Sequence, residues 1–421
     1  MSKEILPQNI DGYKVLKQLG RGSFAHVFLV EDKYDSSRLY ALKKILKPQW
    51  SNYIDEEIRA LEIMSSYPYA PKLHHVERNV GRNKEQVYLL MDYVPGSDIR
   101  RYIRKQGLFN EAQAFKFLTE ILAELSFIHS HSMLHLDIKM TNIMRFKNKF
   151  CLIDWGVSRS EVCVKTANLL GGTRYLAPET YQGFRCAASE IYSLGCVLYY
   201  CVSGKYLFGL KKNDLLEQKI YATTYLTPAF NFPITEKLKY ILQRMLEKDP
   251  LKRATIEEIE NIIAGEWQIE PATELGQNNA IPESSYAIYK QMAEDDKHLV
   301  YAQYRLAYLF EKGDEVEQDI EQAMYWYKKS AIAGYALSQH RLGFLYFSGR
   351  HGIKRSFKNA FYWFSKGANQ KYRRSQYYLG KMYELGKGLK ANKNKAIEFY
   401  TAAMKNSDLK AEERLQVLLS K

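Results

Sequence analysis

Residues 135–142 read His-Leu-Asp-Ile-Lys-Met-Thr-Asn and residues 154–156 read Asp-Trp-Gly, and the rest of the chain is best interpreted outward from these two stretches. Phosphoryl transfer needs a carboxylate for the proton of the attacking hydroxyl, an ammonium beside the γ-phosphate, and side-chain oxygens for metal ions. The stretches supply these groups at Asp137, Lys139, Asn142 and Asp154. They therefore predict a site for a metal-bound triphosphate.

The histidines of this region raise an alternative, a zinc site. His129, His131 and His135 lie close together in the sequence, but their spacing does not suit a tetrahedral zinc site and no cysteine lies nearby. Phosphoryl transfer accounts for the same region without zinc, and we therefore prefer it.

A glycine-bearing turn lies near the N-terminus, between two strand-like runs. Residues 20–27 read Gly-Arg-Gly-Ser-Phe-Ala-His-Val. Glycines allow backbone N–H groups to lie close over phosphate oxygens, although an ordinary glycine hairpin has the same pattern. The candidate nucleotide-binding residues of the turn are Gly20, Gly22, Ser23 and Phe24.

A lysine and a glutamate extend the pattern. Lys43 ends the apolar run Tyr-Ala-Leu-Lys, which taken alone is typical of an exposed strand end. Residues 51–64 then place Ile54, Ile58 and Leu61 on one helix face, and Glu57 borders that face. We therefore expect Glu57 to point inward and to hold the Lys43 ammonium against the α- and β-phosphates.

Taken in order, these features resemble the signature set of eukaryotic-type protein kinases. Three later stretches match the set as well: Ala177-Pro178-Glu179, Ile191–Gly195, and Lys248-Asp249-Pro250 with Arg253. In this family the arginine pairs with the glutamate of the first stretch. The resemblance covers residues 13–264 and implies a bilobal α+β fold, with an antiparallel sheet and a helix in the N-lobe and helices in the C-lobe.

The resemblance also implies roles for single residues. Asp137 is expected to be the catalytic base, and Lys139, two residues later, is the pattern of Ser/Thr kinases. The cofactors are expected to be ATP and Mg²⁺, with Mn²⁺ as a substitute, and the metal ligands to be Asn142 and Asp154. The remaining nucleotide-binding positions are Val27, Ala41, Met91, Asp92, Val94, Asp98 and Met144.

Several positions depart from the family pattern. Ala25 replaces a loop glycine, Trp155 replaces the usual Phe, and Leu136 replaces an arginine that binds a phosphorylated activation loop. We therefore expect activity without phosphate on Thr166 or Thr173. Glu190 stands where the family has an Asp that braces the catalytic loop, and its extra methylene puts that brace in question. The segment 172–177 is one residue shorter than in the family, which puts the substrate-binding loop in question.

The C-terminal third repeats itself. Leu306, Leu342 and Leu379 lie 36 and 37 residues apart, and each unit has a glycine-bearing loop between two helical stretches. The pattern resembles the Sel-one-like repeat (SLR), a relative of the tetratricopeptide repeat, and implies an all-α solenoid for protein–protein contacts. We expect an aromatic stripe to lie in its core, at Tyr325, Trp326, Tyr362, Trp363, Phe399 and Tyr400.

These patterns divide the chain of 421 residues into a multidomain protein. The expected parts are a leader (1–12), a kinase domain (13–264), a linker (265–282) and a repeat domain (283–421). With 46% hydrophobic and 26% charged residues the composition is globular. We expect no transmembrane segment and no secretory signal, and five cysteines without a CxxC pair favour a reducing compartment, the cytoplasm.

Charge is uneven along the chain. The net charge is +14, and residues 341–395 hold many lysines and arginines but one acid, Glu384. Such a run is typical of a solvated helical face. The alternative is that it binds an acidic protein or another anionic partner surface. We expect no specific nucleic-acid binding, because no nucleic-acid motif is present.

Two functions compete. The first is an active Ser/Thr protein kinase whose repeats recruit a protein substrate or partner, and the second is a pseudokinase scaffold that acts through the repeats. The first function is favoured by the presence of all five polar residues that it requires, Lys43, Glu57, Asp137, Asn142 and Asp154. The pairing of kinase and SLR modules also resembles effectors that intracellular bacteria inject into host cells, so secretion into a host is an alternative location.

Overall fold

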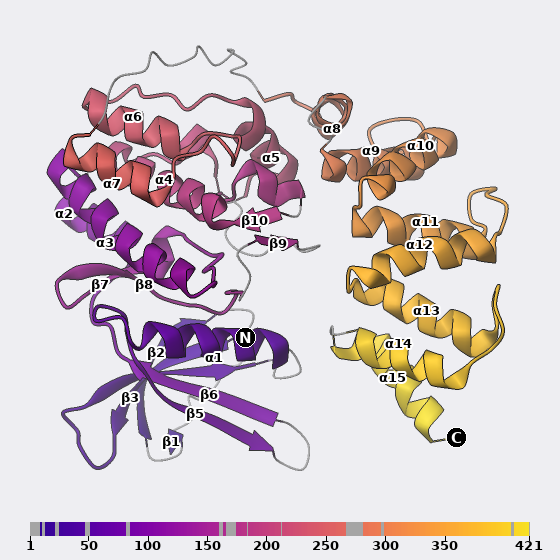
Figure 1. Cartoon of the computed structure of the whole chain (residues 1–421), viewed down its shortest axis with the longest axis horizontal. Coiled ribbons are helices and arrows are strands. Elements are labelled where there is room, and N and C mark those ends of the chain that lie inside the picture. Colours follow the sequence, from indigo (N-terminus) through magenta and orange to yellow (C-terminus); the bar gives the residue numbers. More distant parts are fainter. Residues whose placement is uncertain are drawn as a thin grey trace.

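The computed structural model shows two lobes followed by an array of helices (Figure 1). It describes residues 9–10, 13–21, 25–46, 51–80, 85–159, 163–165, 174–182, 184–211, 213–266, 281–295, 299–405 and 408–420. The fold class predicted from the sequence, a bilobal kinase fold followed by an all-α solenoid, is confirmed.

The N-lobe is one antiparallel sheet with a helix beside it. Its strand order is β1-β2-β3-β4-β6-β5. The bounds are β1 (Asn9–Ile10), β2 (Tyr13–Arg21), β3 (Ala25–Asp32), β4 (Leu39–Ile45), β5 (Leu73–Val80), β6 (Glu85–Asp92) and the helix α1 (Ser51–Met64). Ile54 and Leu61 of α1 lie in one core with Leu89 of β6, so the apolar face predicted for this helix packs against the sheet.

The C-lobe is mainly helical. Its helices are α2 (Ile99–Gln106), α3 (Glu111–Ser130), α4 (Ala187–Ser203), α5 (Leu216–Tyr225), α6 (Glu236–Met245) and α7 (Ile256–Ala264). Its short strands are β7 (Ile143–Phe146), β8 (Lys149–Leu152), β9 (Cys163–Lys165) and β10 (Phe184–Cys186), and its 3₁₀ helices are η1 (Met140–Asn142), η2 (Pro178–Gln182) and η3 (Leu207–Gly209). α4 is buried along nearly its whole length, and its buried residues are mostly apolar, with the polar exceptions Ser189, Glu190 and Ser193.

The repeat domain is a stack of helix pairs beside the kinase lobes (Figure 1). The helices are α8 (Ser285–Glu294), α9 (Val300–Lys312), α10 (Ile320–Ile332), α11 (Ala336–Ser348), α12 (Phe357–Asn369), α13 (Arg373–Leu385), α14 (Lys393–Lys405) and α15 (Leu409–Leu419). The loop glycines Gly313, Gly349 and Gly386 end the first helix of each pair in the left-handed region, with φ of 70°, 68° and 61°. None of the described helices is long and apolar enough to span a membrane.

The aromatic prediction for this domain is partly wrong. Trp326 and Tyr400 are buried, but Tyr325 and Tyr362 are about half exposed, at 50% and 53%. Neighbouring helix positions point about 100° apart, so a stripe of adjacent aromatics cannot all face inward. The helix gap is filled by one aromatic per repeat, in register at Tyr327, Phe364 and Tyr400.

A close approach of the paired helices explains this register. A Cβ added to Gly343 would lie 2.6 Å from the ring of Phe364, and one added to Gly380 would lie 2.8 Å from the ring of Tyr400. The small residue on the first helix therefore makes room for the aromatic ring on the second.

Candidate active site

Two of the predicted catalytic residues, Asp137 and Lys139, meet the predicted metal ligand Asn142 after α3. Lys139 Nζ lies 2.5 Å from Asp137 Oδ2, and Asn142 Nδ2 donates to the same oxygen at 3.1 Å. The Asn142 amide also donates to the Asp137 backbone carbonyl at 3.1 Å. Because 3₁₀ helix η1 turns the chain between them, residues five positions apart converge on one carboxylate.

Lys43 joins the N-lobe to this loop region. Its Nζ lies 2.5 Å from Glu57 Oε1 and 2.8 Å from Asp154 Oδ1. Lys43 and Glu57 are buried, and Asp154 is partly open, with 47% of its side chain exposed. Glu57, the residue expected to face inward, thus meets Lys43 on the strand beside it.

Electrostatics favour the charged forms of Lys43 and Asp154. The Lys43 ammonium lowers the pKa of Asp154 to about 2, against the effect of burial. Burial by itself would lower the pKa of Lys43, but the carboxylates of Asp154 and Glu57 outweigh it and hold that pKa above its usual value. An ionised Asp154 at neutral pH is the state that a metal ligand requires.

Glu190, despite its extra methylene, braces residues 131–139, the loop with Asp137 and Lys139 that we call the catalytic loop. Its Oε1 accepts the backbone N–H of Leu136 at 2.6 Å, and its Oε2 lies 2.6 Å from His129 Nε2. Burial raises the pKa of Glu190, but the His129 contact and the Leu136 N–H more than offset it, so the pKa is lowered. The longer side chain spans α4, the loop and the end of α3, and the brace that the sequence put in question is present.

Leu136 needs this brace, because its φ of +63° lies in the left-handed region that a leucine rarely adopts. A second contact reaches it from β10, where the buried Arg185 donates to the Leu136 carbonyl at 3.3 Å. Sequence reasoning considered His129 only as a zinc ligand and missed Arg185, because both contacts join distant segments.

Trp155 occupies the position of the usual phenylalanine without leaving the core. Its side chain is 2% exposed, and its ring centroid lies 4.5 Å from that of His135. His135 also contacts the Ile153 carbonyl through Nε2 at 3.2 Å and receives the Asp137 N–H through Nδ1 at 3.2 Å. Its ring nitrogens therefore hold the catalytic loop, a role different from the zinc ligation considered above.

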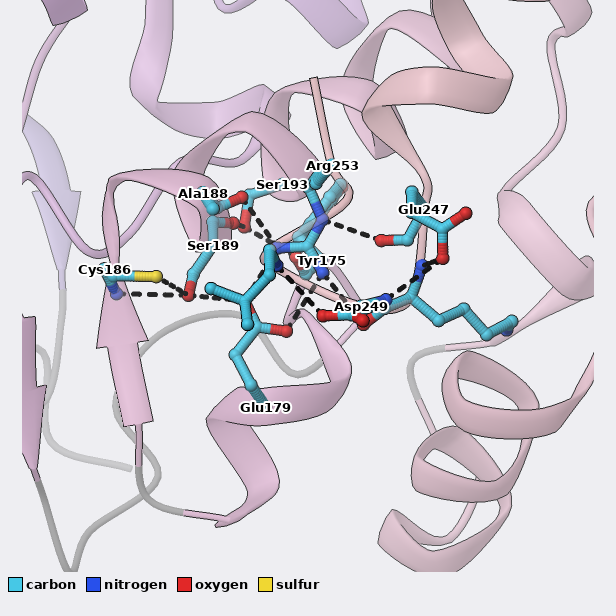
Figure 2. A network of polar contacts seen from close by, with 11 residues as sticks. Tyr175, Glu179, Cys186, Ala188, Ser189, Ser193, Glu247, Asp249 and Arg253 are labelled. Atoms are coloured by element: carbon cyan, nitrogen blue, oxygen red, sulfur yellow. Dashed lines mark hydrogen bonds and ion pairs between the residues drawn. The ribbon is translucent and has the colours of Figure 1, made fainter. Parts of the chain in front are cut away.

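The ion pair predicted between Glu179 and Arg253 is present and buried (Figure 2). Two Arg253 nitrogens lie 2.7 and 3.0 Å from the two Glu179 oxygens, and Ser189 Oγ donates to Glu179 at 2.7 Å. Arg253 further donates to the carbonyls of Ala188, Glu247 and Lys248. The bidentate pair ties residues 174–182, the end of the activation segment that begins at Asp154, to the rest of the C-lobe.

The predicted nucleotide residues lie on neighbouring strands. In the sheet, Val27 pairs with Lys43, and Ala41 pairs with Met91. An isolated bridge joins Asp98 to Met144, and Val94 is buried nearby on the connection to α2. The structure thus brings the strand residues and the loop residues to the junction of the two lobes.

Two acidic residues of this set have partners within the protein. Asp98 Oδ1 accepts the Arg101 N–H at 3.0 Å as the N-cap of α2, and Asp92 Oδ1 lies 2.6 Å from His74 Nε2. Gly20 lies on β2, one residue before the described part of the glycine turn ends at Arg21. The predicted residues Gly22, Ser23, Phe24, Thr166 and Thr173 lie outside the described residues.

Comparison with known proteins agrees with this geometry. A protein kinase domain model matches residues 13–264, and a Sel1 repeat model matches residues 300–335, 336–372 and 373–408. A probable serine/threonine-protein kinase of Dictyostelium discoideum is 28% identical over 257 residues, which is 58% of this chain and 54% of the relative.

Two further relatives are similar to the same part of the chain. A probable serine/threonine-protein kinase of Dictyostelium discoideum, MARK-A, is 30% identical over 271 residues, 62% of this chain and 25% of the relative. A serine/threonine-protein kinase of Arabidopsis thaliana is 29% identical over 252 residues, 58% of this chain and 51% of the relative. The matches therefore span at most about half of these relatives. On the family match and the geometry together, the chain belongs to the protein kinase family and carries three Sel1 repeats after its kinase domain.

Proposed function

We propose that the protein is an ATP-dependent serine/threonine protein kinase. The observation that carries the proposal is the pair of ion clusters, Lys43–Glu57–Asp154 and Asp137–Lys139–Asn142, at the junction of the lobes. A pseudokinase scaffold needs neither a carboxylate beside a catalytic lysine nor a buried lysine–glutamate pair. Their joint presence favours an enzyme.

Each side chain has a definite task in this proposal. Asp137 accepts the proton of the substrate hydroxyl, while Lys139 and the Asn142 amide fix the orientation of its carboxylate. Lys139 would hold the γ-phosphate of bound ATP, and Lys43, positioned by Glu57, would hold its α- and β-phosphates. All these groups are held by protein contacts before substrate binds, so little reorganisation is needed.

The residues present fit a divalent metal. Asp154 offers an ionised carboxylate and Asn142 an amide oxygen, and hard oxygen ligands of this kind suit Mg²⁺, with Mn²⁺ as a substitute. When bound, the metal neutralises charge between the β- and γ-phosphates.

Phosphate transfer from Mg-ATP to a generic basic protein tests the proposal. We expect wild-type protein to label the substrate on serine or threonine, and Asp137→Asn to lose nearly all transfer while still binding nucleotide. Lys328→Gln, an exposed residue of α10, is the control and should retain activity. Absence of transfer from the wild type would favour the scaffold alternative.

We further propose that the repeats bind an acidic protein segment through one edge. The loop of the third repeat lies against the start of α12 in the second repeat, since Lys387 Nζ is 5.6 Å from the ring centre of Phe357. Their exposed cations form a surface that we call the basic edge: Arg350, Lys354, Arg355, Lys387 and Lys390. The matching loop of the first repeat is acidic, at Asp314, Glu315, Glu317 and Asp319.

No acid balances the basic edge from within its own stretch. Glu384, the acid of residues 341–395, binds Arg414 and accepts the Tyr400 hydroxyl at 2.7 Å. The basic loops of the second and third repeats lie next to the acidic loop of the first, and this change of sign along the array makes the surface specific for position.

Binding of the full chain to a poly-glutamate peptide tests this surface. Lys354→Glu with Lys390→Glu should abolish binding, and the equal charge change Lys328→Glu with Lys329→Glu on α10 should not. Affinity should fall as salt rises. Binding to phosphatidylserine vesicles but not to the peptide would instead assign the edge to an anionic lipid surface.

We also place the protein in a reducing compartment such as the cytoplasm, of its own cell or of a host cell into which it is secreted. Cys151, Cys196 and Cys201 are buried free thiols, and burial raises the pKa of each. Uncharged, inaccessible thiols of this kind pack as small apolar groups.

A further inference from the structure

The kinase domain and the repeats share one hydrophobic core. Leu176, Tyr181 and Tyr221 of the C-lobe cluster with Tyr289, Met292 and Tyr301 of the repeat domain, and all six are buried. Helix α8 packs against α5, and α9 packs against η2. The repeats are therefore docked on the kinase domain, in contrast to a tethered module that acts only through effective concentration.

A buried carboxylate fixes the position of this docking. Glu217 on α5 is 7% exposed, accepts the Ser285 hydroxyl at 2.6 Å and accepts the Tyr289 hydroxyl at 3.0 Å. Both hydroxyls come from α8, and the Tyr221 hydroxyl reaches Gln291 on the same helix at 3.2 Å. If α8 moved away, Glu217 would have to replace both hydroxyl contacts, so the interface has one preferred register.

The docking site includes the end of the activation segment. Residues 174–182 contain Glu179, which the buried Arg253 ties to the C-lobe. Leu176 and Tyr181 flank that ion pair and belong to the core shared with the repeats. A salt bridge to the C-lobe and apolar contacts with the repeat domain thus both hold residues 174–182 in place.

We propose that the repeats position residues 174–182 for binding the protein substrate, so that docking of α8 and α9 is a condition for efficient transfer. The inference rests on the proposed kinase activity. It assigns Leu176 and Tyr181 as positioning residues that act through the segment, with Tyr289, Met292 and Tyr301 as their support. Binding of ATP, which involves the N-lobe and the catalytic loop, does not depend on this contact.

Matched arginine substitutions at the two ends of the full-length repeat array test the proposal. Met292→Arg introduces a charge into the shared core, and Leu415→Arg introduces the same charge into the core under the terminal helix α15. Kinetics with a peptide substrate in trans should show KM for the peptide raised about tenfold by Met292→Arg, with KM for ATP within about twofold of wild type. Leu415→Arg should change neither constant by more than about twofold.

A milder variant covers the case in which Met292→Arg does not fold. Tyr289→Phe with Ser285→Ala keeps the apolar contacts and removes both hydroxyls from Glu217, and we expect the same selective rise in the peptide KM, about threefold. An unchanged peptide KM in this variant, or equal effects of the two arginine substitutions, would overturn the proposal.

Amide hydrogen exchange separates this proposal from the kinase activity itself. Peptides covering residues 174–182 should exchange faster in the docking variants than in wild type and Leu415→Arg. That result without any phosphate transfer by wild type would refute the kinase activity and leave the docking intact. Unchanged exchange beside normal wild-type activity would refute the docking role alone.

Discussion

Glu190 and His129 form a contact of 2.6 Å that links the central helix α4 to the end of α3, and the other oxygen of Glu190 holds the backbone of the catalytic loop. A glutamate is long enough to make both contacts. We predict that Glu190→Asp lowers kcat about tenfold or more with little change in KM for ATP, because the shorter carboxylate cannot keep Leu136 in its left-handed conformation. His129→Phe should lower kcat less, since it leaves the Leu136 contact in place.

Substitution of Lys43 should lower activity more than substitution of Glu190. Lys43→Met leaves the carboxylates of Glu57 and Asp154 near each other without the cation that pairs with both. We expect kcat/KM to fall by about a hundredfold or more, as measured by phosphate transfer. Lys44→Met, the neighbouring strand position, is the control and should retain activity within about threefold.

Glu124 predicts a pH-dependent stability. Burial raises the pKa of this carboxyl to about 8 in the folded protein, although the Leu152 N–H opposes the shift at 2.9 Å. Between a pH equal to the ordinary pKa of 4.5 and a pH of about 8, Glu124 keeps its proton in the folded chain but has lost it in the unfolded chain. The free energy of unfolding therefore falls as pH rises through this window, by up to about 1.4 kcal/mol per pH unit.

Glu124→Gln removes this titration and keeps an oxygen for the Leu152 N–H. Urea unfolding of both proteins at pH 5.5 and pH 8 should show that the glutamine variant gains stability over wild type at the higher pH. The same difference at both pH values would mean that Glu124 is ionised throughout.

The leucine at position 136 predicts independence from activation-loop phosphate. Alanine at both Thr166 and Thr173 should leave activity nearly unchanged, because the arginine that would bind a phosphate is absent and Glu190 and Arg185 hold the loop instead. A large loss of kcat in the double variant, restored by phosphate-mimicking acids, would contradict this expectation.

The close contacts between paired helices predict that a larger residue at Gly343 destabilises the repeat domain. Gly343→Ala places a methyl group against the ring of Phe364, and we expect the repeat domain to lose about 1–3 kcal/mol of stability. The second substitution Phe364→Leu should recover part of the loss by making room. The first repeat has Ala307 at the matching position, so the contact there is already adapted to a methyl group.

The sequence alone determined the family and the order of the two modules, and it predicted the residues of the candidate site. Local patterns were sufficient for this, because helix periodicity places Glu57 on a known face, and the short spacing of Asp137, Lys139 and Asn142 restricts them to one loop. The repeat period likewise predicted the helix pairs and the glycines that end their first helices.

The tertiary structure decided what depends on segments far apart in the chain. The Glu190–His129 brace, the contact of Arg185 with Leu136, and the docking of α8 on Glu217 join residues separated by 49 to 72 positions. It also decided which aromatics of the repeats are buried. A local pattern shows which side chains are able to pair, but the partner that each one meets is fixed only when folding brings distant surfaces together and removes water between them.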